Sequence, residues 1–86
     1  MSYFVYILEC NDGSLYTGIT TDIKKRLDEH STKDTGAKYT KIRRPVKLVY
    51  QENSENRSSA SKREYQIKKL TRVKKLQLIK EASFLS

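Results

Sequence analysis

Residues 3–20 read YFVYILECNDGSLYTGIT, and this stretch decides the fold. Two runs of β-branched and aromatic residues, Tyr3–Glu9 and Leu15–Thr20, are typical of strands. Asn11-Asp12-Gly13 between them is a strong turn signal. The sequence therefore predicts two antiparallel strands joined by a three-residue loop.

Side-chain alternation gives the two faces of this hairpin different roles. A three-residue loop sets Tyr6 opposite Gly18, because the turn fixes the register of the strands. Tyr6, Tyr16 and Gly18 then share one face, where the glycine leaves an open space across from a phenol ring. The opposite face carries the apolar side chains that we expect in the core, namely Val5, Ile7, Leu15 and Ile19.

The rest of the chain predicts three helices and one further strand. A first helix follows the hairpin at once, with Thr21 as its N-cap and Asp22 in its first turn. Ile23 and Leu27 give this helix an apolar stripe. Beyond it we expect a basic connection over residues 31–44, a strand over 46–52, and helices over 58–70 and 72–82.

The order of these elements predicts the fold class. In the last helix, Leu76 and Ile79 are expected to face inward. The order β-β-α-β-α-α is typical of an α/β (α+β) fold, with a small three-stranded antiparallel sheet flanked by helices. Eighty-six residues provide for one domain, residues 1–86, with a thin core.

The charge of the chain favours a polyanionic partner. Eighteen Lys and Arg residues stand against ten Asp and Glu, which gives a net charge of +8, and fifteen of the eighteen lie from Lys33 onward. Such a surplus favours nucleic acid first and an acidic membrane surface second. A basic surface that serves only solubility is the alternative, and charge alone decides nothing about catalysis.

The sequence predicts a cytoplasmic location. Cys10 is the single cysteine, which rules out an internal disulfide and suits a reducing compartment. No segment approaches the roughly 18 consecutive apolar residues that a membrane span needs. The apolar N-terminus lacks the basic region and the small-residue cleavage site of a signal peptide.

Two polar residues of the first helix lie beside its apolar stripe. At about 100° per residue, Arg26 lies roughly 60° from Ile23 and His30 roughly 20° from it. Both side chains are therefore expected to flank the buried side of the helix. Two simpler interpretations stay open: an ion pair of Arg26 with a neighbouring acidic residue, Glu29 or Asp22, and a histidine that is merely packed.

A carboxylate is expected on the buried side of the second helix. Glu64 falls between Ala60 and Ile67 on the helix surface, and an inward carboxylate in a thin core needs a compensating charge. A hard cation or a basic side chain provides one. If the helix is rotated, Glu64 and Lys68 form an ordinary surface pair instead.

Two short motifs resemble a known nuclease family. Phe4-Val5-Tyr6 and Tyr16-Thr17-Gly18, whose tyrosines lie ten positions apart, are followed by Arg26 and His30. This order resembles the pattern of the GIY-YIG endonuclease superfamily. Over nearly the whole chain, the resemblance is to its short bacterial single-domain branch, and three further stretches extend it: residues 16–22, residues 36–40 and Arg63-Glu64.

The resemblance implies a role for each matching position. Tyr16 acts as general base on the attacking water or positions it, and Tyr6 forms hydrogen bonds within the same site. Arg26 stabilises the charge that grows on the phosphate, and His30 assists by hydrogen bonding or proton transfer. Glu64 holds one divalent cation, Mg²⁺ or Mn²⁺, against the scissile phosphate.

The sequence also departs from the family pattern. The first motif carries Phe4 and Val5 in place of its glycine and isoleucine, and Leu76 stands where many members have an asparagine. The implied activity is that of an endonuclease, and the alternative is a nucleic-acid-binding module whose nuclease site has decayed. A basic adaptor that docks on protein or ribosomal RNA is a third interpretation.

A basic segment between the first helix and the third strand is suited to the substrate. Its cations and one aromatic ring can contact phosphates and stack on bases. We expect a monomer that acts on DNA rather than RNA and that recognises the structure of the DNA rather than its sequence. We expect neither a small-molecule cofactor nor a membrane as a partner. The residues of this predicted binding segment are Lys33, Lys38, Tyr39, Lys41, Arg43 and Arg44.

Overall fold

A three-stranded antiparallel sheet organises the protein. The computed structural model describes residues 2–32 and 44–85. Its strands are β1 (Tyr3–Glu9), β2 (Leu15–Thr20) and β3 (Lys47–Ser54), arranged in the order β2-β1-β3. The predicted fold class and the element order β-β-α-β-α-α are confirmed. Because β1 is the central strand, its residues pack on both faces and pair on both sides.

The hairpin between β1 and β2 has the register that the turn predicts. Tyr6 pairs with Gly18, and the same pairing runs along the full length of β2. Gly13 adopts a φ of +83°, a conformation that residues with a side chain rarely enter, and its N–H donates to the carbonyl of Cys10 at 2.9 Å. The turn glycine thereby fixes which side chains share a face.

Helix α1 (Ile23–Thr32) has its N-cap one residue later than predicted. The backbone N–H of Lys25 donates to Oδ1 of Asp22 at 3.0 Å, and the N–H of Arg26 donates to the carbonyl of Asp22 at 3.0 Å. Asp22 is therefore the N-cap, and the prediction of Thr21 was wrong. Thr20 explains the difference, because its Oγ1 accepts the N–H of Asp22 at 3.1 Å and turns the chain there.

Helices α3 (Arg57–Lys68) and α4 (Arg72–Leu85) follow β3. The side chain of Asn56 caps α3 by accepting the N–H of Ser59 at 2.9 Å. The two helices lie close to their predicted ranges of 58–70 and 72–82. Within the parts of the chain that the structure describes, no helix is long and apolar enough to cross a membrane.

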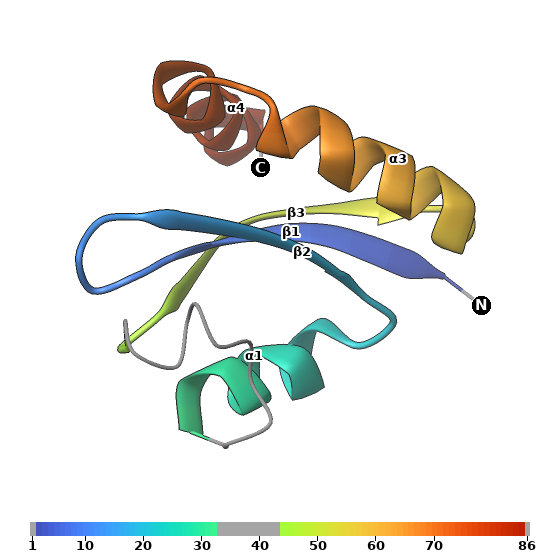
Figure 1. Ribbon diagram of the computed structural model, residues 1–86, viewed down its shortest axis with the longest axis horizontal. Helices are drawn as coiled ribbons and strands as arrows, with labels where there is room; N and C mark the ends of the chain where they lie inside the picture. The colour runs from blue at the N-terminus through green and yellow to red at the C-terminus, as the bar shows by residue number, and fades with distance from the viewer. Residues whose placement is uncertain (1, 33–43, 86) are drawn as a thin grey trace.

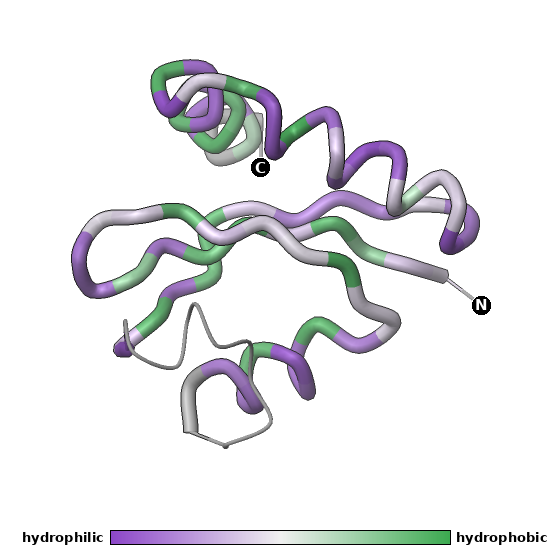
Figure 2. The backbone as a smooth tube through the Cα atoms, viewed as in Figure 1, coloured by the Kyte–Doolittle hydropathy of each residue, from purple (hydrophilic) through white to green (hydrophobic). Residues whose placement is uncertain are grey.

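The sheet lies between two helical layers (Figure 1). Helix α1 covers one face, and α3 and α4 cover the other. Apolar positions recur along the strands and hydrophilic ones along α3 (Figure 2). The core lies between the sheet and α3, where four buried side chains form one cluster: Val5, Ile7, Ala60 and Ile67.

The inward face of α4 differs from its prediction in one position. Leu78 and Ile79 pack against the core cluster. Leu76, which we expected to face inward, is 40% exposed. The first turns of α4 are too polar to fix the rotation of the helix from its sequence, so packing against β3 decides which residues are buried.

Candidate active site

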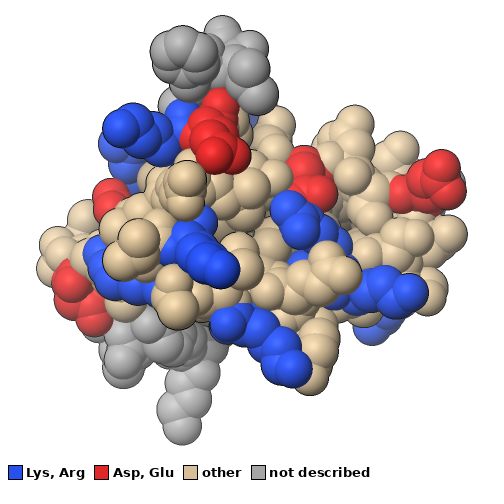
Figure 3. Space-filling model, turned by 90° about the horizontal axis from the view of Figure 1, so that it is seen from above, with Lys and Arg blue, Asp and Glu red and all other residues tan. Residues whose placement is uncertain are grey.

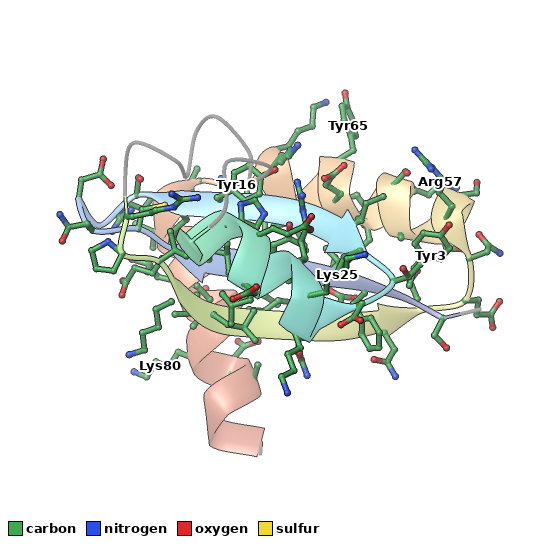
Figure 4. All side chains as sticks on the ribbon, turned by 90° about the horizontal axis from the view of Figure 1, so that it is seen from below. Tyr3, Tyr16, Lys25, Arg57, Tyr65 and Lys80 are labelled. Atoms are coloured by element: carbon green, nitrogen blue, oxygen red, sulfur yellow. The ribbon has the colours of Figure 1, made fainter. Side chains whose placement is uncertain are left out.

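Side chains of the two motifs gather on the face of the sheet that α1 covers. Tyr6 projects from the central strand β1 and is only 2% exposed. Tyr16 projects from the edge strand β2 and is half-buried. Figure 4 shows its position at the edge of the sheet. Helix α1 adds His30, which is fully buried, and Arg26. Two strands and one helix thus bring together four of the five residues that we predicted.

A buried hydrogen bond joins the two halves of this cluster. The hydroxyl oxygen of Tyr6 lies 2.9 Å from Nε2 of His30. The Tyr16 ring lies 5.1 Å from the His30 ring, and the two tyrosine rings lie 6.4 Å apart, measured between centroids. These spacings are those of packed aromatic rings, so the three side chains hold one another in place.

Gly18 is required by the position of the Tyr6 phenol. A Cβ atom at residue 18 would lie 2.6 Å from the hydroxyl oxygen of Tyr6 and 2.8 Å from its Cζ atom. It would also lie 3.1 Å from Cε2 of Tyr16. The first two distances are shorter than real Cβ contacts, so any side chain at this position displaces the ring. The Tyr6 phenol therefore fills the space beside Gly18 that the hairpin register led us to expect open, so that part of the prediction was wrong.

Burial sets the protonation states of the central pair. It raises the pKa of Tyr6 to about 12, although a hydrogen bond with Arg26 acts in the opposite direction. Burial, followed by the positive charge of Arg26, lowers the pKa of His30 to about 4. At neutral pH the pair is therefore a neutral phenol and a neutral imidazole. Neither carries a formal charge into the site.

Arg26 is a cation of α1 that contacts Tyr6. Its guanidinium pairs with Glu29 at 3.4 Å and keeps 29% of its side chain exposed. Burial acts to lower the pKa of Arg26, but hydrogen bonds with Tyr6 and Glu29 outweigh it and raise that pKa. The pairing with Glu29, which we considered as a simpler interpretation, coexists with the contact to Tyr6. Arg26 thus carries a permanent positive charge at the border of the tyrosine cluster.

Glu64, the fifth predicted residue, lies on a different layer. Helix α3 packs against β2 and β1 from the opposite face of the sheet. Only 23% of the Glu64 side chain is exposed, and its Oε2 lies 3.5 Å from Nζ of Lys68. Both interpretations from the sequence thus describe part of its setting, because Glu64 is mostly buried and also paired. After burial and the charge of Tyr16, the negative charge of Glu64 also acts to raise the pKa of Tyr6.

A polar network that the sequence analysis missed ties α3 to β3. Nε of Arg63 donates to Oε1 of Glu52 at 2.9 Å, and the hydroxyl of Tyr50 donates to the same oxygen at 2.8 Å. The sequence did contain a signal for this network: Tyr50 and Glu52 lie two residues apart in the predicted third strand, so their side chains share one face. Arg63 directly precedes Glu64, so this network also helps to fix the rotation of α3 that orients Glu64.

The single carboxylate of Glu64 fits one hard cation that the protein would coordinate only in part. Among residues 2–32 and 44–85, no three His, Cys, Asp or Glu side chains form a ready metal cluster. Glu64 is a largely buried carboxylate that already attracts a cation, the Lys68 ammonium. Mg²⁺ commonly takes one or two carboxylates and completes its shell with water and substrate phosphates. A single carboxylate therefore suits that ion.

Most of the predicted binding segment lies outside the described residues. This applies to Lys33, Lys38, Tyr39, Lys41 and Arg43. The remaining member, Arg44, contacts the end of α1: its Nε donates to the carbonyl of His30 at 2.6 Å and its Nη2 to the carbonyl of Glu29 at 3.2 Å. A cation at a helix C-terminus is stabilising, so Arg44 has a structural role that the sequence did not reveal.

Comparisons with known proteins place this geometry in a family. Proteins of several Staphylococcus aureus strains, called UPF0213 protein, are 61% identical to the chain over 80 residues, which is 93% of this chain and 96% of theirs. The solution NMR structure of the UPF0213 protein BH0048 from Bacillus halodurans has a TM-score of 0.60 at 46% identity, over 93% of this chain and 84% of that one.

A second solution NMR structure, of the protein EF2693 from E. faecalis, has a TM-score of 0.64 at 42% identity, over 100% of this chain and 90% of that one. The family model described as "GIY-YIG catalytic domain" matches residues 2–77. The match spans both tyrosine motifs, Arg26, His30 and Glu64. The chain therefore belongs to the GIY-YIG family, and this membership implies nuclease activity on a nucleic-acid substrate.

Proposed function

We propose that the protein is a divalent-metal-dependent endonuclease that hydrolyses phosphodiester bonds, with DNA as its substrate and with a preference for structure rather than sequence. The convergence of Tyr6, Tyr16 and His30, with the Tyr6 phenol seated against Gly18, supports this proposal most strongly. Such a cluster of hydroxyl and imidazole groups, with Arg26 beside it, suits the handling of a water molecule and a phosphate.

The two tyrosines have different tasks in the proposed mechanism. Tyr6 keeps its proton at neutral pH, because its pKa is about 12, so it serves as a hydrogen-bonding group and not as a base. Tyr16 lies at the accessible edge of the sheet and positions the attacking water or takes its proton. The water oxygen then bonds to phosphorus as the bond to the leaving oxygen breaks, and the leaving oxygen takes up a proton from solvent.

His30 and Arg26 prepare the site on either side of Tyr6. A neutral imidazole has one nitrogen that donates and one that accepts, so His30 can hold the Tyr6 hydroxyl in one orientation through Nε2. Arg26 offers its charge to the phosphate oxygens as negative charge grows on them. Because the guanidinium is already in contact with Tyr6 and Glu29, little reorganisation is needed when the substrate arrives.

Glu64 would hold the divalent cation. A bound Mg²⁺ or Mn²⁺ supplies positive charge to the scissile phosphate and stabilises the developing oxyanion. The Lys68 ammonium now beside this carboxylate must move by the few ångströms that a flexible side chain allows. Glu64 belongs to α3, so the carboxylate and Tyr16 approach the edge strand β2 from opposite faces of the sheet.

A binding module without cleavage is the second candidate, and one contact favours it. The Lys68 ammonium at 3.5 Å already compensates the charge of Glu64 without a metal. Leu76, in the place where many family members have an asparagine, is exposed and supplies no polar group. In this case the predicted binding segment would still bind nucleic acid, and the cluster of Tyr6, Tyr16 and His30 would be a structural remnant.

A cleavage assay separates the two candidates. Purified protein is incubated with branched, nicked, single-stranded and fully paired DNA, and with the matching RNAs, in Mg²⁺, Mn²⁺ or EDTA. We expect cleavage of the branched or nicked DNA with either metal, and none in EDTA. Binding to all substrates without cleavage in either metal would reject the nuclease in favour of the binding module.

The salt dependence of binding tests the electrostatic part of the proposal. Contacts to three to five phosphates give a slope of log affinity against log salt of about −3 to −4.5 on duplex DNA. Lys41→Glu should weaken binding to all sequences alike, because phosphate contacts carry no sequence information. An affinity independent of salt would exclude the basic segment as the binding surface.

A further inference from the structure

A line of exposed side chains runs along α3 beside the candidate active site. Arg57, Ser61, Tyr65 and Lys69 recur every four residues, so they lie on one side of the helix, and all four are exposed. We call them the α3 stripe. Figure 4 shows that Arg57 and Tyr65 both point away from the sheet on the side of the β2 edge, where Tyr16 also lies.

Tyr65 is the central feature of the α3 stripe. Tyr65 is 61% exposed, so its ring is accessible to a ligand. The Nζ atom of Lys69 lies 4.7 Å from the centre of the ring. This cation–π contact steadies the ring in an outward position and adds a positive charge next to it. An aromatic face and a cation are thereby presented together to the solvent.

The surroundings of Tyr65 are basic rather than apolar. Lys68 and Lys69 follow it on the same helix. Lys and Arg side chains recur across the lower half of the face drawn in Figure 3, including the right-hand part over α3. Among the residues whose exposure the structure describes, the other exposed large apolar side chains, Val73 and Leu76, belong to α4. An exposed aromatic ring among cations fits a polyanion better than it fits the apolar surface of a protein partner.

The α3 stripe adjoins the proposed catalytic groups. Tyr65 directly follows Glu64, and α3 packs against β2, the strand that carries Tyr16. Residues 57–69 extend over about 18 Å at 1.5 Å per residue, which corresponds to about five steps of 3.4 Å along one strand of nucleic acid. A strand that lies along the stripe therefore passes close to Glu64, which lies near the middle of residues 57–69.

We propose that the α3 stripe binds a single-stranded segment of the nucleic acid next to the cleaved bond, with Tyr65 stacked on an unpaired base. Arg57 and Lys69 contact the phosphates on either side. The ring projects from a convex helix, so it cannot reach bases that are stacked inside a duplex, whereas an unpaired base can turn outward onto it. This inference rests on the proposed function and specifies its substrate as DNA with an unpaired arm.

Binding experiments in EDTA, which prevents metal-dependent cleavage, test the inference by comparing the wild-type chain with variants of Tyr65. The probes are a duplex with a single-stranded arm that carries one 2-aminopurine, and a fully paired duplex of the same sequence. Tyr65→Ala should weaken binding of the armed duplex by about five- to a hundredfold, because loss of one base–aromatic stack has that effect. Binding of the paired duplex should change less than twofold.

Two variants control for other causes. Tyr65→Phe keeps the ring, so it should retain the affinity for the arm and the quenching of 2-aminopurine fluorescence. Val73→Ala removes an exposed side chain of similar apolar character from α4 and should leave both probes unchanged. The circular dichroism of all variants should match the wild type, because alanine is a better helix former than tyrosine.

Equal weakening of both probes by Tyr65→Ala would overturn the inference, and so would no effect on either. This outcome is separate from the fate of the nuclease proposal. If Tyr65 quenches the 2-aminopurine fluorescence of the arm but the protein never cleaves the DNA, the α3 stripe is supported and the nuclease proposal is rejected. If the protein cleaves armed DNA and Tyr65→Ala leaves its binding unchanged, the nuclease proposal is supported and the role of the α3 stripe is rejected.

Discussion

The two sides of the sheet contribute to the candidate site in different ways. On the α1 side, Tyr6 and His30 are buried and bonded to each other, and their pKa values are shifted far from the ordinary ones. On the α3 side, Glu64 retains some exposure and pairs with Lys68. One half of the site is thus fixed by packing, and the other half by charges that solvent can reach.

This difference shows how a thin domain can combine rigidity with ligand exchange. Groups that must keep one geometry are placed where packing restricts them. A carboxylate that must release one cation and accept another is placed where an ammonium can leave into water. Substitutions on the α1 side should therefore reduce stability first, whereas substitutions on the α3 side should reduce activity first.

The largest effect is expected for Glu64→Gln. The change keeps the size and the helix propensity of the side chain but removes the charge that a divalent cation needs. Mg²⁺-dependent cleavage should fall by at least about a hundredfold, which corresponds to about 2.7 kcal/mol of transition-state stabilisation. Binding in EDTA should persist, and Glu81→Gln, an exposed glutamate of α4, should behave as the wild type. Full activity of Glu64→Gln would remove this residue from the mechanism.

Gly18→Ala should be the most damaging substitution for stability. The new Cβ atom would lie 2.6 Å from the Tyr6 hydroxyl oxygen, so the buried ring must move. We expect a loss of about 1–3 kcal/mol in the free energy of unfolding, measured by urea titration. In a Tyr6→Leu background, which lacks the hydroxyl and the distal ring, the same substitution should cost much less. Equal costs in both backgrounds would contradict the close approach of residue 18 to Tyr6.

The pH dependence of the α1 side follows from the lowered pKa of His30. The folded pKa of about 4 lies below the ordinary value of 6.5, so the unfolded chain binds more protons between these limits. His30 therefore contributes stability above about pH 6.5 that is lost as the pH falls toward 4. The chain has one histidine, so a single imidazole resonance reports its titration by NMR. A midpoint near 6.5 in the folded protein would contradict the burial of His30.

The smallest effect is expected for Arg63→Gln on the α3 side. The ion pair of Arg63 with Glu52 at 2.9 Å is partly exposed, with 37% and 28% of the two side chains accessible. Its loss should lower the free energy of unfolding by less than about 1 kcal/mol. Lys62→Gln, the adjacent exposed cation, is the matched control and should have no effect. A loss as large as that of Gly18→Ala would show that α3 is fixed as rigidly as the tyrosine cluster.

The hairpin and its facing side chains were predictable because they depend on local rules. The turn at Gly13 sets the register, and the register sets Tyr6 against Gly18. Thr21 and Asp22 are both good N-caps, so the sequence could not separate them, and the hydroxyl of Thr20 decided the start of α1. Local rules therefore placed elements to within a few residues.

Contacts between layers were beyond the reach of local rules. The bond between Tyr6 and His30 depends on how α1 sits against the sheet, and spacing along the chain does not determine that arrangement. Leu76 was assigned to the wrong side of α4 for the same reason. The burial of Glu64 and its pairing with Lys68 were treated as alternatives from the sequence, but helix α3 satisfies both at once.

The strand order β2-β1-β3 determines which errors the protein can tolerate. A mutation on β1 disturbs a strand with neighbours on both sides, so its first consequence is a smaller population of folded molecules. A mutation on β2 alters the edge of the sheet, so many such variants fold but bind or cleave the substrate differently. Selection for abundance and selection for turnover thus act on adjacent strands. Gly18 is the position where they coincide, because a side chain on the rim strand there displaces a ring of the central one.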